Sequence, residues 1–206
     1  IGARDLDDYG QWVTYNDYGR VWFPSAVAAN WAPYRFGRWS WVQPWGWTWV
    51  DDAPWGFAPF HYGRWVRIGA RWAWCPGDYV ARPVYAPALV TFFGGDGWSA
   101  SPITGPTFTW VPLGWGEPYV PWYTYSPTYW RQVNRPVVRE IAVNANVEPW
   151  RPHTYAHLAV PGALTAVAAG AFVGGRPVAQ HYMRNLSEAA VRSAPPARMA
   201  EVVPPA

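Results

Sequence analysis

The sequence predicts a mainly β protein, built from tandem Trp-rich antiparallel hairpins that form a twisted meander. Three observations favour this fold. Aromatic residues fill 19% of the 206 positions and charged residues only 14%. Short sequence blocks recur about every 26 residues. The 19 Gly and 23 Pro interrupt the chain too often for long helices. After the hairpins we expect a Pro-rich irregular segment and a small C-terminal tail with at most one short helix.

The repeat is visible when the sequence is shifted against itself. A shift of 26 residues aligns 31–39 with 57–65, where Ala-Pro and Gly-Arg-Trp recur in register. A shift of 28 carries Phe57-Ala58-Pro59 onto Tyr85-Ala86-Pro87. A period of this length is typical of one supersecondary unit stacked on copies of itself. We therefore place units at about 18–36, 37–62 and 63–90, and expect consecutive hairpins through residues 18–82.

Within the first complete unit, residues 37–42 and 47–51 alternate large aromatic residues with small or polar ones. This period of two is typical of a strand with one covered face. Pro44-Trp45-Gly46 forms the turn between the two strands, and the short connection requires antiparallel pairing. We expect Trp41 opposite Trp47 and Trp39 opposite Trp49, which places all four rings on one face.

The second unit repeats this scheme. Its strands are predicted over 61–66 and 71–75, joined through 67–70, and Pro76-Gly77-Asp78 ends the second strand. The single cysteine, Cys75, lies in that strand and excludes an intrachain disulfide. We interpret it as a small buried apolar residue, with an intermolecular disulfide as the alternative.

The character of the chain changes after the hairpins. Residues 83–130 contain many prolines but only two charged residues, Asp96 and Glu117. Such a stretch must be buried against the hairpins or another molecule. We assign 1–130 to a Trp-rich domain and 131–206 to an Ala/Val-rich segment that packs on it or on a neighbouring subunit. Ser187 is the expected cap of one short helix.

Charge and hydropathy exclude several classes of function. Sixteen basic residues, all Arg, stand against 13 acidic ones, giving a formal charge of +3 without any basic run. This distribution argues against nucleic acid as a partner. The longest uncharged stretches carry too much Pro, Ser, Thr and Gly for a membrane-spanning segment.

The repeated blocks also carry a family resemblance. Residues 31–39, 45–49 and 57–65, followed by 163–165 and 172–177, resemble a Trp-rich family of exported bacterial proteins known only as a domain of unknown function. Members often carry this array after a FecR-like domain. The resemblance spans about residues 9–180 and implies export to the extracellular space, the periplasm or the cell surface. It implies no catalytic residue.

Nine residues of the repeats form the candidate ligand or assembly surface. They are Trp39, Trp41, Trp47, Trp49, Trp65, Trp72, Trp74, Arg38 and Arg64. Such rings can stack on the apolar faces of sugars, while Arg or Asp meets the hydroxyls. The same rings can instead be the core of a sheet protein that has few Leu, Ile and Met, which is the interpretation we favour. Arg20, Arg38 and Arg64 would then form cation–π pairs with neighbouring rings.

Catalytic and metal-binding patterns are weak. Asp51 and Asp52 are adjacent, whereas a glycosidase needs two acids across a cleft, so a turn is the simpler interpretation. His153 and His157 have the i, i+4 spacing of metal ligands on a helix, but Pro152 and the lack of a third ligand argue against a site. We therefore expect no enzyme, no catalytic residue, no cofactor and no metal.

Three functions fit these features. The first is a structural, self-assembling protein of the cell envelope or extracellular space, a filament or matrix component whose partner is another copy of itself. Its self-association residues would be Trp98, Trp110, Trp115 and Trp122. The alternative is a carbohydrate or cell-wall binding module with a Trp stacking surface. A third, recognition of Pro-rich segments by aromatic grooves, is a variant of self-assembly. The exposure of the Trp rings distinguishes the first two.

Overall fold

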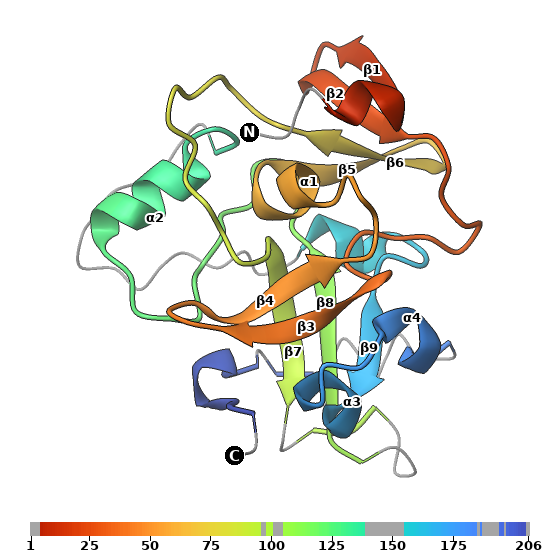
Figure 1. The fold of residues 1–206 in the computed structure, drawn as a ribbon, viewed down its shortest axis with the longest axis vertical. Helices are drawn as coiled ribbons and strands as arrows, with labels where there is room; N and C mark the ends of the chain where they lie inside the picture. Colours follow the sequence, from red (N-terminus) through yellow and green to blue (C-terminus); the bar gives the residue numbers. More distant parts are fainter. Residues whose placement is uncertain are drawn as a thin grey trace.

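In the computed structural model, residues 5–95, 98–100, 105–138, 155–184, 186, 194–195 and 197–204 are described. Their nine strands make three antiparallel sheets (Figure 1). The strands are β1 (Gly10–Tyr15), β2 (Gly19–Pro24), β3 (Gly37–Val42), β4 (Gly46–Asp51), β5 (Arg64–Ile68), β6 (Arg71–Cys75), β7 (Val90–Gly95), β8 (Thr107–Pro112) and β9 (Thr165–Ala168). The sheets have the strand orders β1-β2-β6-β5, β3-β4 and β7-β8-β9.

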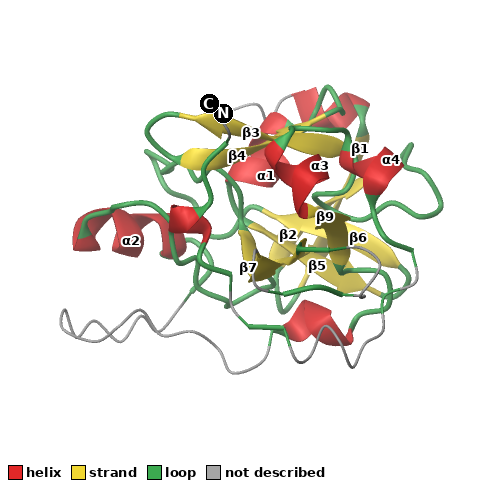
Figure 2. Ribbon diagram, turned by 90° about the horizontal axis from the view of Figure 1, so that it is seen from below, coloured by secondary structure: helices red, strands yellow, loops and turns green. Residues whose placement is uncertain are grey.

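The helices among these residues are short, and Figure 2 shows α2 set to one side, away from the strands. They are α1 (Phe57–His61), α2 (Pro127–Asn134), α3 (Ala169–Val173) and α4 (Val178–His181), with 3-10 turns η1 (Asp5–Asp8), η2 (Ala156–Ala159) and η3 (Met199–Glu201). The prediction of a mainly β fold is confirmed. Within the described ranges, no helix has the length and apolar character needed to cross a membrane.

The β3–β4 hairpin has the predicted register. Trp39 pairs with Trp49 and Trp41 with Trp47. The ring centroids are 5.3 Å and 5.5 Å apart, respectively. Directly opposed residues share a face, and so do residues two apart along one strand, so the four rings lie together as expected. The alternation of aromatic with small or polar residues was therefore sufficient to predict the register of this hairpin.

The hairpins do not follow one another in a single meander, and in this respect the prediction is wrong. Strand β2 pairs with β6, through Trp22 opposite Trp74, while β3–β4 forms a separate sheet. The strand predicted from His61 begins at Arg64, because Phe57–His61 form α1. A period-two pattern states which face of a strand is covered, but it does not specify the neighbouring strand.

Trp39 lies where the layers meet. Figure 1 shows β3–β4 crossing over the β7-β8-β9 sheet, and Trp39 points into the space between them. Its ring is 1% exposed and lies within 5.5 Å of the rings of Trp49, Phe92, Trp110 and Phe172. Phe172 belongs to α3, so helix, hairpin and sheet share one aromatic cluster.

Within the uncharged stretch after the repeats, residues 86–92 and 107–114 are buried by the chain itself. The stretch contributes β7 and β8, and β9 from the C-terminal segment pairs with β8. The C-terminal residues also cover β7, because Gly94 N donates to Pro195 O (2.8 Å) and Ala197 N donates to Phe92 O (3.1 Å). Packing on a second copy is therefore not needed to bury residues 86–92 and 107–114.

The tail contains more helix than expected. Both α3 and α4 lie within 131–206, so the prediction of at most one short helix there is wrong. Ala-rich residues favour helix at α3, Gly174 and Gly175 end it, and Pro177 precedes the next turn. The helix expected after Ser187 lies outside the described residues.

Replacing Trp39 tests the shared cluster. Trp39→Ala should lower the free energy of unfolding by about 3–5 kcal/mol, because it leaves a cavity between two sheets and a helix. Urea unfolding followed by circular dichroism measures this change. Val42→Ala, on the same strand but 36% exposed, is the control and should lower stability by less than about 1 kcal/mol. Equal effects of the two substitutions would contradict the central position of Trp39.

Candidate functional site

A cleft of about 760 Å³ lies between α1, α2 and the loop of residues 76–84. One wall comes from Ala58, His61 and Tyr62, and the opposite wall from Gln132, Val133 and Pro136. Trp74 and Leu89 complete the lining together with the loop. The volume is in the range of small-molecule and oligomer binding sites.

Backbone contacts hold this cleft open. Asp78 N donates to Pro136 O (2.8 Å), which fixes the loop to the end of α2. Gly77 has a φ of +84°, and a Cβ at this position would clash with the Pro136 carbonyl. Only glycine therefore permits so close an approach. Ser126 caps α2 by accepting from Tyr129 N (3.1 Å), with Pro127 at the first helical position.

His61 forms an uncharged part of the wall. Its Nδ1 donates to the Ala86 carbonyl at 2.8 Å, which selects the tautomer. Burial lowers the pKa of the imidazole to about 4, so the ring is neutral at neutral pH. The ring stacks on Tyr85 with centroids 4.7 Å apart. His61 thus presents an aromatic surface without a charge.

A group of aromatic residues adjoins the cleft, and we refer to it as the aromatic shelf: Trp45, Phe57, Tyr62 and Tyr85. Phe57 is exposed and the other three are half-buried. Phe57 is 52% exposed and stacks on Tyr85 at an interplanar angle of 24°. Trp45 lies 4.8 Å from Tyr85, and Tyr62 lies 6.2 Å from Phe57. Because Tyr62 belongs to both the shelf and the cleft wall, the two surfaces are continuous.

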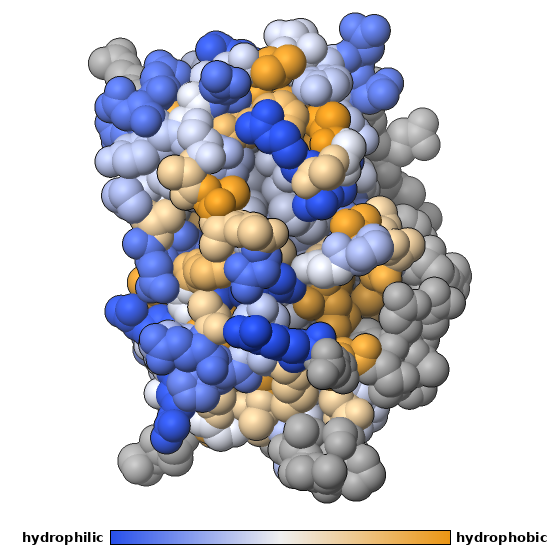
Figure 3. Space-filling view, turned by 90° about the vertical axis from the view of Figure 1, so that its right-hand side faces the viewer, coloured by the Kyte–Doolittle hydropathy of each residue, from blue (hydrophilic) through white to orange (hydrophobic). Residues whose placement is uncertain are grey.

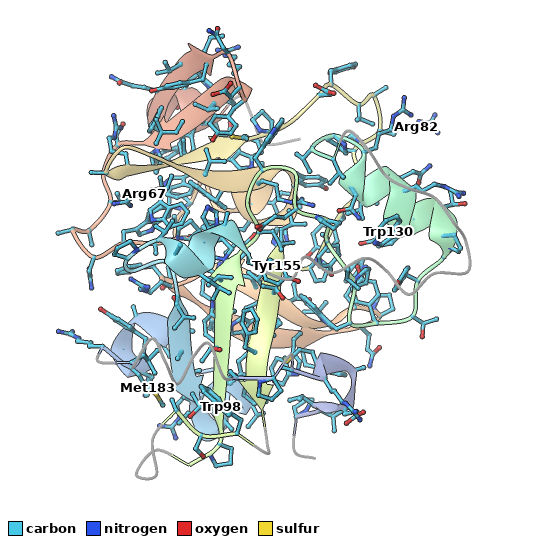
Figure 4. All side chains as sticks on the ribbon, turned by 180° about the vertical axis from the view of Figure 1, so that it is seen from behind. Arg67, Arg82, Trp98, Trp130, Tyr155 and Met183 are labelled. Carbon is cyan, nitrogen blue, oxygen red and sulfur yellow. The ribbon has the colours of Figure 1, made fainter. Side chains whose placement is uncertain are left out.

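Polar side chains occur on the loop side and on α2. Asp78 and Arg82 come from the loop, and Gln132 comes from α2. All three are exposed, and Figure 4 shows Arg82 beside the end of α2. Among the described residues that line the cleft, Asp78 is the sole carboxylate. Tyr79, on the same loop, is 93% exposed.

The predicted surface residues lie mostly in the core. Trp39, Trp47, Trp49, Trp65, Trp72 and Trp74 are at most 5% exposed, and Trp41 is half-buried against Trp47. Of these, Trp74 alone lines the cleft, and its Nε1 donates to the Tyr62 carbonyl (2.8 Å). The core interpretation therefore describes these rings, and they provide no open stacking surface.

The arginines of the repeats have different roles. Arg20 stacks over Trp12 at 4.7 Å, as expected, and Arg38 is exposed. The expectation of a cation–π pair for Arg64 is wrong. Arg64 is 1% exposed, and it donates through Nε to Glu117 O (3.0 Å) and through Nη2 to Asn134 Oδ1 (2.9 Å). Its guanidinium satisfies acceptors of the second half of the chain rather than stacking on a ring.

Of the four residues expected to form a self-association surface, Trp110 and Trp122 pack on the same two rings, those of Trp39 and Phe92. Trp110 is fully buried, and Trp122 packs on Phe92 at 5.3 Å. Trp115 lies against Tyr18, and Figure 4 shows Trp98 near one end of the β7-β8-β9 sheet. Each of the four contacts its own chain, and self-association through them stays a prediction.

The other singled-out residues are structural. Asp51 forms the expected turn, accepting from Ala53 N (3.0 Å) and Trp49 Nε1 (2.9 Å), and burial raises its carboxyl pKa to about 7. Cys75 is buried, and burial raises its thiol pKa to about 12. His157 bonds through Nδ1 to the Pro112 carbonyl, while His153 lies outside the described residues. The described part of the chain contains no cluster of metal ligands.

The sequence prediction missed the shelf, although a signal for it was present. Phe57 and Tyr85 are the first residues of the two blocks related by the shift of 28, and these two rings stack on each other. The repeat therefore indicated two residues whose rings are in contact. The repeat did not predict how exposed these rings are, because that depends on the short helix α1.

Comparison with known proteins gives one match. Residues 3–117, more than half of the chain, match the model of a family of unknown function, DUF6600. The matched region includes the shelf and the loop of the cleft, whereas α2 lies beyond it. No curated protein and no solved structure matches the chain.

The buried Asp51 carboxyl should make stability depend on pH. Its pKa in the folded chain is above the unfolded value, so the protonated form stabilises the fold, and this contribution is lost as pH rises from about 4 to about 7. We expect the wild-type protein to lose stability over this range relative to Asp51→Asn. The pKa of His61 is lowered, so its contribution makes stability rise with pH below about pH 6.5, opposite to that of Asp51. Both wild type and Asp51→Asn contain His61, so the difference between their stabilities isolates the contribution of Asp51.

Urea unfolding of both proteins at several pH values provides that difference. Asp52→Asn, which changes the exposed neighbouring carboxylate, is the control. The Asp52 charge contributes least to the raised pKa of Asp51, and desolvation contributes most, so this variant should keep a pH profile close to wild type. A wild-type minus Asp51→Asn difference that stays constant from pH 4 to 7 would contradict the buried carboxyl.

Proposed function

Because the chain belongs to DUF6600, a family of unknown function, we propose its function from the cleft: a non-enzymatic module that binds an extended polysaccharide of the bacterial cell envelope. The observation that supports it is the run of aromatic rings, half-buried at Tyr62 and Tyr85 and exposed at Phe57 and Tyr79, from the cleft onto the shelf. Tyr79 and Tyr62 border the cleft, and Phe57 and Tyr85 extend its surface.

Sugar rings match such a surface well. Each ring has apolar C–H faces that pack on aromatic side chains, and its hydroxyls both donate and accept hydrogen bonds. Asp78 supplies acceptors, Arg82 supplies donors and Gln132 supplies both. A Pro-rich peptide lacks N–H groups at its prolines and offers mainly carbonyl acceptors, so it has little use for the Asp78 carboxylate. The polar lining therefore favours a glycan over a Pro-rich peptide.

A polymer fits better than a single sugar. The cleft and the shelf share Tyr62, so one extended chain can contact both surfaces without a gap. Most of these rings are already fixed by contacts within the protein. Tyr129 Oη donates to the Tyr85 carbonyl (2.8 Å), and His61 stacks on the Tyr85 ring. A surface held in this way loses little entropy when the ligand binds.

The proposal of binding without catalysis rests on the titratable groups of the lining. Glycoside hydrolysis generally uses two carboxyl groups on opposite sides of the scissile bond. Asp78 has no carboxylate facing it from the described lining residues, and the Nδ1 of His61 is engaged by a backbone carbonyl. Export and the envelope setting belong to the proposal as well, supported by the resemblance to exported Trp-rich proteins.

Two exposed rings provide the test. Tyr79→Ala and Phe57→Ala should each weaken polysaccharide binding by about tenfold, because each removes one stacking surface. Affinity gel electrophoresis against a panel of envelope polysaccharides, followed by calorimetry with the best one, measures the loss. Tyr9→Ala is the matched control, since Tyr9 is 39% exposed and does not line the cleft.

Three outcomes would contradict this function. One is the failure of every polysaccharide in the panel to bind the folded wild-type protein. Another is binding that the Tyr79→Ala and Phe57→Ala variants retain at wild-type strength. The third is tighter binding of a Pro-rich peptide than of any glycan, which would assign the cleft to a protein partner.

A further inference from the structure

Strand β1 is an exposed edge, whereas three other edge strands, β4, β7 and β9, bond to neighbouring segments through their outer backbone groups. The outer side of β7 bonds to Pro195 and Ala197. On the outer side of β9, Ala166 O accepts from Met183 N (2.9 Å), and on that of β4, Trp49 N donates to Pro87 O (3.0 Å). Strand β1 ends the four-stranded sheet, at the upper rim of Figure 1. Within the described residues, no backbone bond reaches its outer side.

The pattern of pairing with β2 identifies the free groups. Ser25 N donates to Tyr9 O, so the neighbouring pair, Gly10 and Pro24, is a pair without mutual hydrogen bonds. Pro24 has no N–H to donate, which agrees with this assignment. Because the two kinds of pair alternate, the N–H and C=O groups of Gly10, Trp12 and Thr14 point away from β2.

We propose that β1 pairs antiparallel with β1 of a second copy, about a two-fold axis through Val13, so that the two four-stranded sheets become one continuous sheet. In this register Trp12 faces Thr14 of the partner subunit, and both have outward backbone groups that can bond. Val13 faces Val13 of the partner subunit as a pair without mutual hydrogen bonds. Opposed residues keep to the same side of the sheet, so the covered face of one sheet continues that of the other.

The sequence of β1 fits a second copy as the occupant. Its residues, Gly-Gln-Trp-Val-Thr-Tyr, include no charge and no proline, which are the features that usually block edge pairing. Val13 is 41% exposed and would be covered by its own symmetry mate. Antiparallel pairing of identical strands is self-complementary and closes after two subunits.

The character of the surface favours an association held mainly by backbone hydrogen bonds between the two β1 strands. On the face that Figure 3 presents, apolar and hydrophilic residues are interspersed rather than gathered into one apolar patch.

The acidic residues Asp8 and Asp17 flank the two ends of β1, and the pairing brings them towards each other. Association should therefore strengthen as salt screens this repulsion. A six-residue strand buries less than a stable dimer interface, so we expect a Kd on the order of 10–1000 µM.

Cross-linking tests the axis directly. In Val13→Cys, the facing Cα atoms would be about 4.5 Å apart, within the span of a disulfide. Mild oxidation should therefore give a disulfide-linked dimer on a non-reducing gel. Cys75 is fully buried and does not compete. Val27→Cys, at a loop position with 38% exposure, is the matched control and should stay monomeric. A monomeric Val13→Cys protein, or equal cross-linking of both variants, would overturn the proposal.

Sedimentation equilibrium of the unmodified chain gives an independent measurement. Wild type should show a monomer–dimer equilibrium, Val13→Lys should raise its Kd at least about tenfold, and Val27→Lys should not change it. Circular dichroism verifies that both variants are folded. Wild-type protein that stays monomeric up to about 1 mM, or that forms open polymers, would refute the closed pairing. Polysaccharide binding by Val13→Lys separates this result from the function of the cleft.

Discussion

The indole N–H is the constraint on which much of this core depends, because a buried tryptophan brings a donor that water no longer satisfies. Among the described residues the buried donors of Trp39 and Trp65 have no acceptor, but those of several other buried tryptophans do. Four of these donors reach backbone carbonyls: Trp22 bonds to Leu6, Trp47 to Val202, Trp74 to Tyr62 and Trp110 to Tyr34, all at 2.8–2.9 Å. Two of the acceptors belong to the first and last described segments. The choice of tryptophan over aliphatic residues thus ties both ends of the described chain to the sheets.

Two buried arginines extend the same principle to the rest of the molecule. Arg35 donates to the carbonyls of Gly162 and Leu164, and Arg64 donates to that of Glu117. Segments rich in proline carry carbonyls without an equal number of N–H groups, so they cannot satisfy themselves as a sheet does. A guanidinium, with five donors and no acceptor, supplies what these segments lack. The interpretation of Arg64 as a cation–π partner failed because the sequence does not show which carbonyls need a donor.

The sequence predicted those parts of the fold that depend on neighbours along the chain. The β3–β4 register follows from alternation and one turn, and the buried state of Cys75 follows from its strand. The pairing of β2 with β6, and of β9 with β8, depends on segments far apart, and no periodicity encodes it. The cleft likewise depends on segments that are far apart in the sequence. The Asp78–Pro136 hydrogen bond joins a loop to a helix end more than fifty residues later, and neither segment carries a pattern that indicates the other.

The aromatic residues therefore divide by position rather than by type. Rings on the alternating strand positions, such as Trp39 and Trp49, point inward and hold the layers together. Rings at turns and helix starts are less completely covered: Phe57 is 52% exposed and Trp45 is half-buried. A binding surface assigned from Trp content alone would select the first group. The binding surface that we propose lies instead where the repeat is interrupted, in line with the tendency of loops on a rigid scaffold to carry function.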